Sequence, residues 1–497
     1  MSVRFLQRAP APVLLCAALA LFVFFSRAWL IDVWGSPLPF FDQWDAEASA
    51  LFLPWLRGDL DWDAFFRPHN EHRIALTRLA DLLLLSLSGY WNVWGQLFLI
   101  AVLHAATAAI VVRPLLTPLA ARSRALLLFA TAIFFSSTGG WQNALWGFQS
   151  QFAFSNLLSI AAIVGTVCAG PFSPRWCFGA FASFLVLFTN GGGVLASGVA
   201  FAFAIPKSSG STRRSRLAGA TVLGLIVLLG LLLRVDAPHH HSLRATNLHQ
   251  FLELFSRCLA WPWIEHGALA LVIQVPLALL LVVRLRQRTP WDLADRCALG
   301  FGGLTLLHAA AIGYSRGAGL AEIGPLSRYL DAFLPGAVAQ VYALLQLAAS
   351  ATRPVRLLAL GWAAIAAAGL IALTEVNLTV HLPRKRLLDR IGIEVVRTYV
   401  ATGNAAILLN DLSASALHPF RPQSVRDVLD EPLLLAILPP DLRAPADSPL
   451  QSPPVLIEHG ATLALLSALV FCALNVIAFR CDLSQRSDHS NTRTPSG

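Results

Sequence analysis

The stretch PVLLCAALALFVFFSRAWLI, residues 12–31, holds a single charged side chain, that of Arg27, among twenty residues. About twenty predominantly apolar residues are what a helix needs to cross the hydrocarbon core of a bilayer. Arg4 and Arg8 precede the stretch, and no clear small-x-small cleavage site follows it. It is therefore predicted to be an uncleaved signal anchor and the first transmembrane helix.

The composition of the whole chain extends this prediction. Of the 497 residues, 56% are apolar and only 13% are charged, whereas an average soluble domain has about a quarter charged residues. So few charges cannot cover a soluble surface of this size, and lipid must solvate most of the chain. The net charge of +9 comes mainly from basic residues in short gaps between apolar runs, which is the placement that orients membrane proteins. We therefore predict an all-α polytopic membrane protein with no nucleic-acid partner.

Further apolar runs predict a bundle of about 12 transmembrane helices. The candidates are residues 12–31, 91–112, the shorter run 125–138, 152–170, 217–234, 266–283, 297–314, 331–350, 355–373 and 460–479. Residues 177–205 are interrupted by Thr189-Asn190-Gly191-Gly192-Gly193 and fit either one span or two short helices. Two helices place the basic residues between 207 and 216 in the cytoplasm, in line with the positive-inside tendency. We therefore predict both termini to be cytoplasmic.

This orientation divides the chain into four parts. Residues 1–373 form a transmembrane module with a first outer loop at 32–90, and residues 374–459 form a small exocytoplasmic segment. Residues 460–479 form the last transmembrane helix, and residues 480–497 a cytoplasmic tail. Within the exocytoplasmic segment, an amphipathic helix is predicted at 382–400 and a short strand at 405–409. Because long loops tend to carry function, chemistry is expected at the outer face of the inner or plasma membrane.

The first outer loop opens with three acids, Asp42, Asp45 and Glu47, flanked by aromatic residues. If this segment is helical, Asp42 and Asp45 share a face. A carboxylate near a lipid boundary has a raised proton affinity, which suits a general base for a sugar hydroxyl. The alternative is an acidic interfacial loop within an aromatic belt.

A second polar block follows in the same loop. It contains His69, Asn70, Glu71, His72 and Arg73. The two histidines, with the glutamate between them, are compatible with a metal site. The same side chains can hydrogen-bond a phosphate or a sugar, which we favour, or form a turn that caps the next helix.

Two other outer segments carry candidate substrate contacts. Tryptophan and amide side chains that suit sugars, or an interfacial belt, occur at Trp141, Gln142, Asn143 and Gln149. Side chains that suit an anionic phosphate, or lipid headgroups, occur at Arg316, Arg328 and Tyr329. The run at residues 239–241, three histidines, is expected to be a solvated loop.

The first span, a long outer loop opening with Asp42, Asp45 and Glu47, an interfacial amphipathic stretch and many further spans together resemble the GT-C superfamily of membrane glycosyltransferases. That superfamily includes protein mannosyltransferases and lipid A aminoarabinose transferases. Residues 41–44 and 69–73 also resemble a group of bacterial polytopic membrane proteins. The resemblance covers the architecture of roughly residues 1–370. The family often has adjacent acids in this loop, whereas the acids here are spaced, so both aspartates stay candidates.

The resemblance implies transfer of a sugar from a polyprenyl-phosphate carrier to a hydroxyl of a glycolipid, polysaccharide or protein on the exocytoplasmic face. Asp42, or as second choice Asp45, would be the general base. Arg316 or Arg328 would stabilise the phosphate leaving group, while residues 69–73 would position donor or acceptor. No cofactor is implied, and a divalent metal is compatible with the chemistry but not required.

The main alternative is a multi-span transporter or flippase, followed by a polysaccharide polymerase or ligase for lipid-linked substrates. Transporters usually have ionisable residues and broken helices near the middle of the membrane. In this sequence the charged residues gather at the outer ends of the predicted spans. That distribution favours chemistry at the membrane surface over a transmembrane path.

Overall fold

The computed structural model describes residues 11–204, 212–287, 291–349, 353–445, 448–449, 454 and 459–491. Predictions for Arg4, Arg8, residues 207–211 and the end of the tail at 492–497 fall outside these residues. Throughout the described ranges the chain is helical, with no strand. The strand predicted at 405–409 is wrong, because Ala405–Ile407 form a turn of 3₁₀ helix that Asn404 caps through its side chain.

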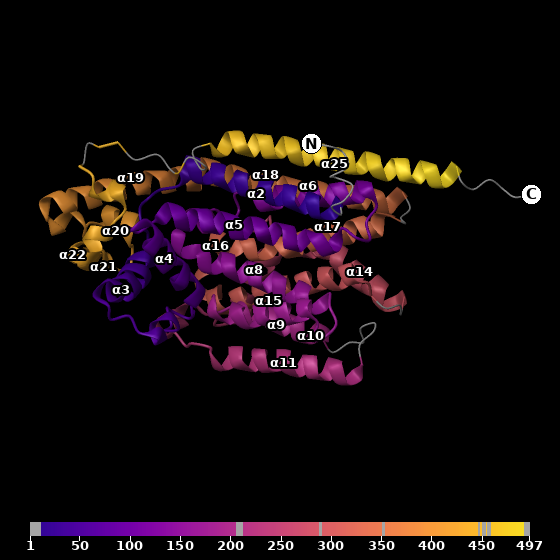
Figure 1. Ribbon diagram of the computed structural model, residues 1–497, viewed down its shortest axis with the longest axis horizontal. Coiled ribbons are helices and arrows are strands. Elements are labelled where there is room, and N and C mark those ends of the chain that lie inside the picture. The colour runs from indigo at the N-terminus through magenta and orange to yellow at the C-terminus, as the bar shows by residue number, and fades with distance from the viewer. Residues whose placement is uncertain are drawn as a thin grey trace, which may run out of the picture.

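The long helices run side by side along the longest axis of the molecule (Figure 1). They are α2 (Ala11–Trp34), α5 (Val93–Val112), α6 (Ala121–Ser136), α8 (Ser150–Val167), α9 (Pro174–Leu185), α10 (Gly193–Ala204), α11 (Arg213–Leu232), α14 (Val275–Gln287), α15 (Leu293–Leu320), α17 (Leu334–Ala349), α18 (Arg353–Val376) and α25 (Gly460–Asn491). Eight helices are long and apolar enough to cross a membrane, or nine if the bent pair at 267–287 is one span, by length and composition within the described residues. An all-α polytopic membrane protein is thus confirmed, whereas 12 spans and cytoplasmic termini stay predictions.

The interrupted stretch at 177–205 forms two helices. The first, α9, continues as a 3₁₀ turn over Val186–Phe188, and α10 begins at Gly193. A side chain at Gly193 would collide with the carbonyl oxygen of Val186, so only glycine allows the chain to return this closely. Both helices are shorter than a full span.

Some spans lie at the edge of the bundle. In α11 and α25 only 17% of the most apolar window is buried against the rest of the protein, compared with 72% in the span Gly147–Val167, which contains α8. Leu228, Leu231 and Leu232 of α11 are exposed and have no protein neighbour to cover them. Lipid tails are the solvent that such apolar faces require.

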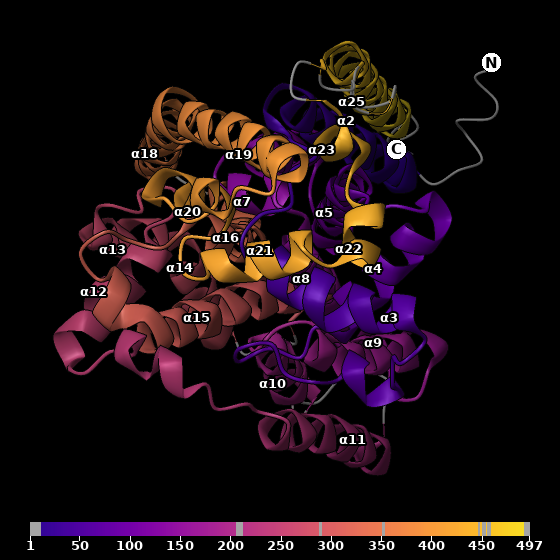
Figure 2. The ribbon, with the colours of Figure 1, turned by 90° about the vertical axis from the view of Figure 1, so that its left-hand side faces the viewer.

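Further helices, most of them short, cover one end of the bundle (Figures 1 and 2). They are η1 (Gln43–Phe52), α3 (Leu53–Arg57), α4 (Ala75–Ser88), α7 (Trp141–Leu145), η6 (Pro238–Leu243), α12 (Leu248–Leu259), α16 (Ser327–Leu330), α19 (Leu382–Thr402), α20 (Asp411–Leu417), α21 (Pro422–Leu429) and α22 (Pro432–Ile437). The helix predicted at 382–400 is confirmed as α19. We call this end the outer end, following the predicted orientation.

The C-terminal segment packs onto the first outer loop, although more than 300 residues separate them in the sequence. The N–H of Phe41 donates to the carbonyl oxygen of Leu417 (2.8 Å), and the N–H of Trp91, the residue that follows this loop, donates to that of Ile437 (2.7 Å). Trp44 is fully buried in a hydrophobic cluster that contains residues of both segments. The two segments therefore form one structural unit at the outer end.

Candidate functional site

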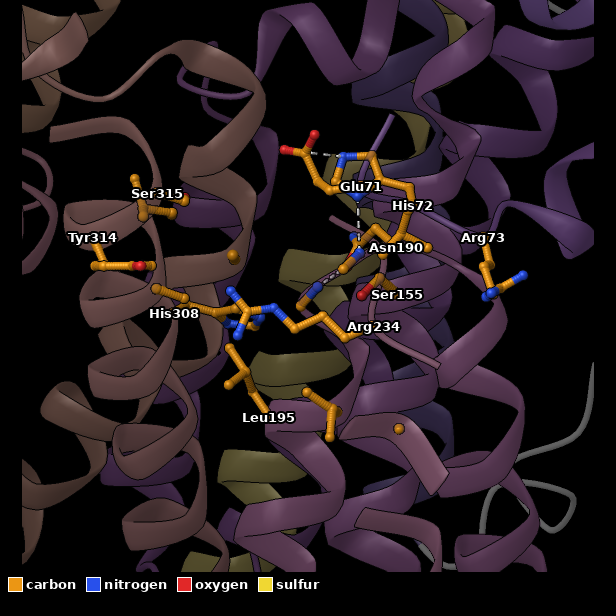
Figure 3. Close-up of a pocket in the computed structure, with 18 of the residues that line it drawn as sticks. Glu71, His72, Arg73, Ser155, Asn190, Leu195, Arg234, His308, Tyr314 and Ser315 are labelled. Carbon is orange, nitrogen blue, oxygen red and sulfur yellow. Dashed lines mark hydrogen bonds and ion pairs between the residues drawn. The ribbon is translucent and has the colours of Figure 1, made fainter. Parts of the chain in front are cut away.

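Two adjoining cavities open at the outer end. The outer cavity, of about 480 Å³, lies between the first outer loop, the C-terminal segment and α16. The deep cavity, of about 420 Å³, extends between α8, α10, the end of α11 and α15 (Figure 3). Their shared lining residues are His72, Phe152, His240, Arg316 and Tyr329. The two cavities therefore meet at a junction that carries both charge and aromatic surface.

A tight turn places Asp42 at the wall of the outer cavity. Phe41 has a φ of 55°, in the left-handed region that a bulky residue rarely adopts. The side chain of Gln43 stabilises the turn by accepting a hydrogen bond from the N–H of Phe40 (3.0 Å). Asp42 precedes η1, and its carboxylate lies 3.6 Å from Nε2 of His69. This carboxylate lines the cavity without a close arginine or lysine partner among the described residues.

Asp45, the second acid, is bound by the C-terminal segment. Its Oδ2 lies 3.1 Å from Nε2 of His418 and accepts a hydrogen bond from Arg421 (3.2 Å). Burial raises the pKa of Asp45, but the hydrogen bond from His418 and the charges of His418 and Arg421 outweigh burial and lower it. Sequence reasoning missed both partners of Asp45. His418 and Arg421 lie 373 and 376 positions further along the chain, and no local pattern links residues so far apart.

Glu47, predicted as a substrate contact, lies beneath the turn and lines neither cavity. Its Oε2 accepts hydrogen bonds from Gln43 (3.2 Å), Gln96 (2.8 Å) and Trp91 (2.7 Å), and the residue is 1% exposed. Burial raises the pKa of Glu47 to about 7. Gln96 also donates to Asp81 (2.8 Å), whose pKa burial raises as well. This network supports Gln43 and, through it, the turn at Asp42.

The predicted block at 69–73 forms a tight loop at the junction of the cavities. His69 and His72 exchange two backbone hydrogen bonds of 2.8 and 2.9 Å, and Asn70 between them has a φ of 51°. Glu71 forms an ion pair with Arg316 of α15 and a hydrogen bond with His240. Burial raises the pKa of Glu71, but the positive charges of His72 and Arg316 outweigh burial and lower it to about 2. The carboxylate is therefore ionised at neutral pH.

The His72 ring connects this loop to the break between α9 and α10. Its Nδ1 accepts a hydrogen bond from the N–H of Gly191 (2.9 Å), which requires an unprotonated nitrogen. Burial lowers the pKa of His72 to about 4, so the ring is neutral at pH 7. Arg73, the last residue of the block, donates to the carbonyl oxygens of Leu233 (3.1 Å) and Phe66 (2.6 Å). Its guanidinium is therefore held by backbone at the edge of the deep cavity (Figure 3).

The histidine run contacts the site, contrary to the expected solvated loop. His239 bonds Oδ1 of Asn70 (2.9 Å), and His240 contacts Glu71. Only His241 behaves as expected, since it is about half-exposed and pairs with Asp236. The tertiary structure thus adds two rings to the wall of the outer cavity.

The remaining candidates fall into two groups. Arg328, whose guanidinium carbon lies 5.4 Å from the Tyr329 ring centre, lines the outer cavity together with Tyr329 and Gln149. Trp141, Gln142 and Asn143 line neither cavity.

Those three residues instead support α16. The side chain of Gln142 accepts from the N–H of Arg328 (3.1 Å), and Asn143 donates to the Arg328 carbonyl oxygen (3.0 Å) and to Asp331 (2.9 Å). Trp141 is buried and stacks on His381. The amides therefore orient the element that carries Arg328 and Tyr329.

The deep cavity contains a cation that the sequence did not single out. Arg234, just after α11, extends from its backbone toward His308 of α15 (Figure 3). Within the described residues its guanidinium has no hydrogen-bond or ion-pair partner. The surrounding wall is largely apolar, with Leu187, Leu195 and Ile312 among its residues. An aliphatic wall beside an unpaired cation suits a lipid phosphate and its chain.

The block at 69–73 contains two histidines and a glutamate, which are residue types that bind metals. Among the described residues, no group of three or more His, Cys, Asp or Glu side chains has a metal-binding arrangement. The expectation that a metal is compatible but not required stays an expectation.

No protein-family model and no curated protein matches this chain. The structure is similar to a crystal structure of ArnT from Cupriavidus metallidurans in the apo state, with 18% sequence identity and a TM-score of 0.42. That similarity covers 92% of this chain and 76% of the other. A similarity this distant does not assign an activity.

Proposed function

We propose that this protein is a membrane glycosyltransferase that moves a sugar from a polyprenyl-phosphate carrier to a hydroxyl of an acceptor at the exocytoplasmic face. One observation carries the proposal: a cavity between helices with an aliphatic wall meets a cavity lined by two aspartates, and arginine and histidine side chains line the place where they meet. A lipid-linked donor needs this combination, because its chain is apolar, its phosphate anionic and its sugar polar.

The donor would occupy both cavities. The polyprenyl chain would lie against the apolar wall formed by Leu187, Leu195 and Ile312, with access from the bilayer beside α11. The phosphate would lie at the junction, where Arg316 supplies positive charge, and Arg234 in the deep cavity adds a second cation. The sugar would then project into the outer cavity toward Asp42.

Asp42 is the better candidate for the general base. Asp45 accepts hydrogen bonds from two partners, and its lowered pKa makes it a weak proton acceptor. Asp42 would accept the proton of the acceptor hydroxyl as that oxygen attacks the anomeric carbon. The bond between that carbon and the phosphate oxygen would break, and Arg316 or Arg328 would stabilise the negative charge of the released polyprenyl phosphate.

The acceptor would enter through the mouth of the outer cavity. Phe420 (79% exposed) and Arg421 line this side, and both belong to the C-terminal segment. An aromatic ring and a guanidinium suit the apolar face and the hydroxyls of a sugar. A glycolipid, a polysaccharide or a glycosylated protein would all present such groups.

The direct test is to incubate the purified protein with a panel of polyprenyl-phosphate sugars and a sugar-containing acceptor lipid. Mass spectrometry should detect a new glycosidic bond with one donor, and that donor should raise the unfolding temperature of the protein. A transporter would move a labelled donor across vesicle membranes without forming a new bond. Movement without bond formation, for every donor that binds, would contradict the proposal.

A further inference from the structure

A third cavity lies at the opposite end of the bundle from the two described above. It has a volume of about 250 Å³ and lies between the start of α2, the end of α5, the end of α8 and the start of α9. Its walls are apolar and include Val13, Ile110 and Val164, and its charged lining residues are Arg113 and Arg175. We call it the inner cavity. Nothing in the proposed transfer reaction uses it.

The two arginines are cations without protein partners. Among the described residues, neither guanidinium has a hydrogen bond or ion pair, and no acid lines the cavity. Two other arginines at this end of the bundle have partners: Arg284 pairs with Asp295, and Arg296 donates to the carbonyl oxygen of Phe203 (3.0 Å). Arg113 and Arg175 therefore leave two positive charges at the mouth of an apolar hollow.

We propose that the inner cavity binds the phosphate headgroup of an anionic phospholipid, with Arg113 and Arg175 on the phosphate and the upper part of one acyl chain against the apolar wall. Basic pockets between membrane helices are suited to such headgroups, because the guanidinium donors match phosphate oxygens. The volume holds only part of a lipid, so the rest of the molecule stays in the bilayer.

The edge of the cavity supports a lipid as the occupant. Val13 and Phe178 line the cavity and are 41% and 61% exposed, so its apolar wall continues onto the surface that faces lipid tails. Residues 1–10 lie outside the described structure, and they carry Arg4 and Arg8 with no acid. Charge repulsion therefore disfavours this segment as the occupant of a site that already holds two arginines.

The experiment compares the full-length protein in detergent with added phosphatidylglycerol, phosphatidylcholine or inorganic phosphate. Bound lipid is counted by native mass spectrometry, and thermal unfolding is followed in parallel. Phosphatidylglycerol should bind and raise the unfolding temperature, phosphatidylcholine should bind at least tenfold more weakly, and inorganic phosphate should give no comparable stabilisation. Equal binding of both lipids, or equal stabilisation by phosphate alone, would overturn the proposal.

Two variants test the site itself. The double variant Arg113→Gln/Arg175→Gln should weaken phosphatidylglycerol binding at least tenfold. The matched control Arg213→Gln/Arg214→Gln, which removes two arginines of α11 away from the cavity, should bind the lipid like the parent protein. An equal loss of phosphatidylglycerol binding in both double variants would indicate a general effect of charge and would contradict the proposed binding site.

If the first double variant does not fold, Ala109→Phe provides a second test. It fills the cavity from α5 and keeps both arginines, and it should also weaken lipid binding. Unchanged lipid binding in this variant would contradict the proposal. Because the inner cavity is separate from Asp42 and Arg316, its failure would leave the proposed transferase function untouched.

Discussion

The outer cavity and the deep cavity differ in what their walls are made of, although they share a junction. The outer cavity is lined by Asp42 and Asp45 and by histidines and arginines from four distant segments of the chain, whereas the deep cavity lies between helices and has the aliphatic wall of Leu187, Leu195 and Ile312 beside its own arginines. The difference teaches that the two aspartates and the aliphatic wall lie in separate cavities. It also predicts that mutations in the two cavities will have different kinetic effects.

The largest expected effect is at Asp42. Asp42→Asn should lower the rate of sugar transfer by about 10²- to 10⁴-fold, because a general base contributes that much to a proton transfer. Asp45→Asn should lower it by about tenfold or less, because Asp45 is held by His418 and Arg421 and affects the site through packing. Initial rates with a saturating donor measure both. If Asp45→Asn abolished transfer and Asp42→Asn did not, the assignment of the base would be reversed.

The next effect concerns the junction. Arg316→Gln should weaken donor binding by about 10- to 100-fold, which corresponds to the loss of about 1.5–3 kcal/mol for a hydrogen bond to a charged group. Glu71→Gln should retain donor binding, because it frees Arg316 for the phosphate. Thermal-shift titration with the donor measures both, and Arg257→Gln, whose partner Glu253 lies outside both cavities, is the control. Unchanged donor binding in Arg316→Gln would place the phosphate elsewhere.

A smaller effect is expected in the wall of the deep cavity. Leu195→Trp should fill the space proposed for the carrier chain and raise the KM for a long-chain donor by about tenfold, since overpacking costs about 1–3 kcal/mol. A short-chain analogue of the same donor should be affected much less. Comparing the two KM values separates the chain from the sugar. Equal losses for both donors would show that the deep cavity does not hold the chain.

The smallest effect concerns the pH dependence of protein stability that comes from Glu47, which is buried beneath the turn at Asp42. Glu47 has a folded-state pKa of about 7, above its ordinary value of 4.5, so its contribution to stability is full below pH 4.5 and declines up to about pH 7. Glu47→Gln should remove this decline and gain at most about 3 kcal/mol relative to the parent at pH 8. His72 and Glu71, with lowered pKa values, change stability in the opposite direction at acid pH.

Thermal unfolding of Glu47→Gln and of the parent protein from pH 5 to 8 measures the difference in their stability. The contributions of His72 and Glu71 are present in both proteins and cancel in this difference. A parallel pH dependence for Glu47→Gln and the parent would show that Glu47 does not titrate in this range. Transfer activity should change little in this variant, because a glutamine can still accept the hydrogen bonds from Gln43, Gln96 and Trp91.

The outer loop shows what sequence reasoning could and could not reach. The sequence singled out Asp42 and Asp45 because ionisable groups beside a lipid boundary are costly to keep, and Arg316 and Arg328 because guanidinium groups suit an anionic phosphate. It could not place Trp141, Gln142 and Asn143, which resemble sugar contacts in composition but form the support of α16. It also assigned the histidine run to solvent, although His240 contacts Glu71.

By itself, the sequence determined the helices, the break at 189–192 and the acid-rich first loop, because these follow from local apolar length, glycine and charge. Only the tertiary structure decided that His418 and Arg421 bind Asp45, that Glu71 pairs with Arg316, and that Arg234 enters an apolar cavity. The physical reason is distance along the chain. A hydrophobic span is specified by its own twenty residues, whereas a contact between positions hundreds of residues apart depends on how all the helices pack.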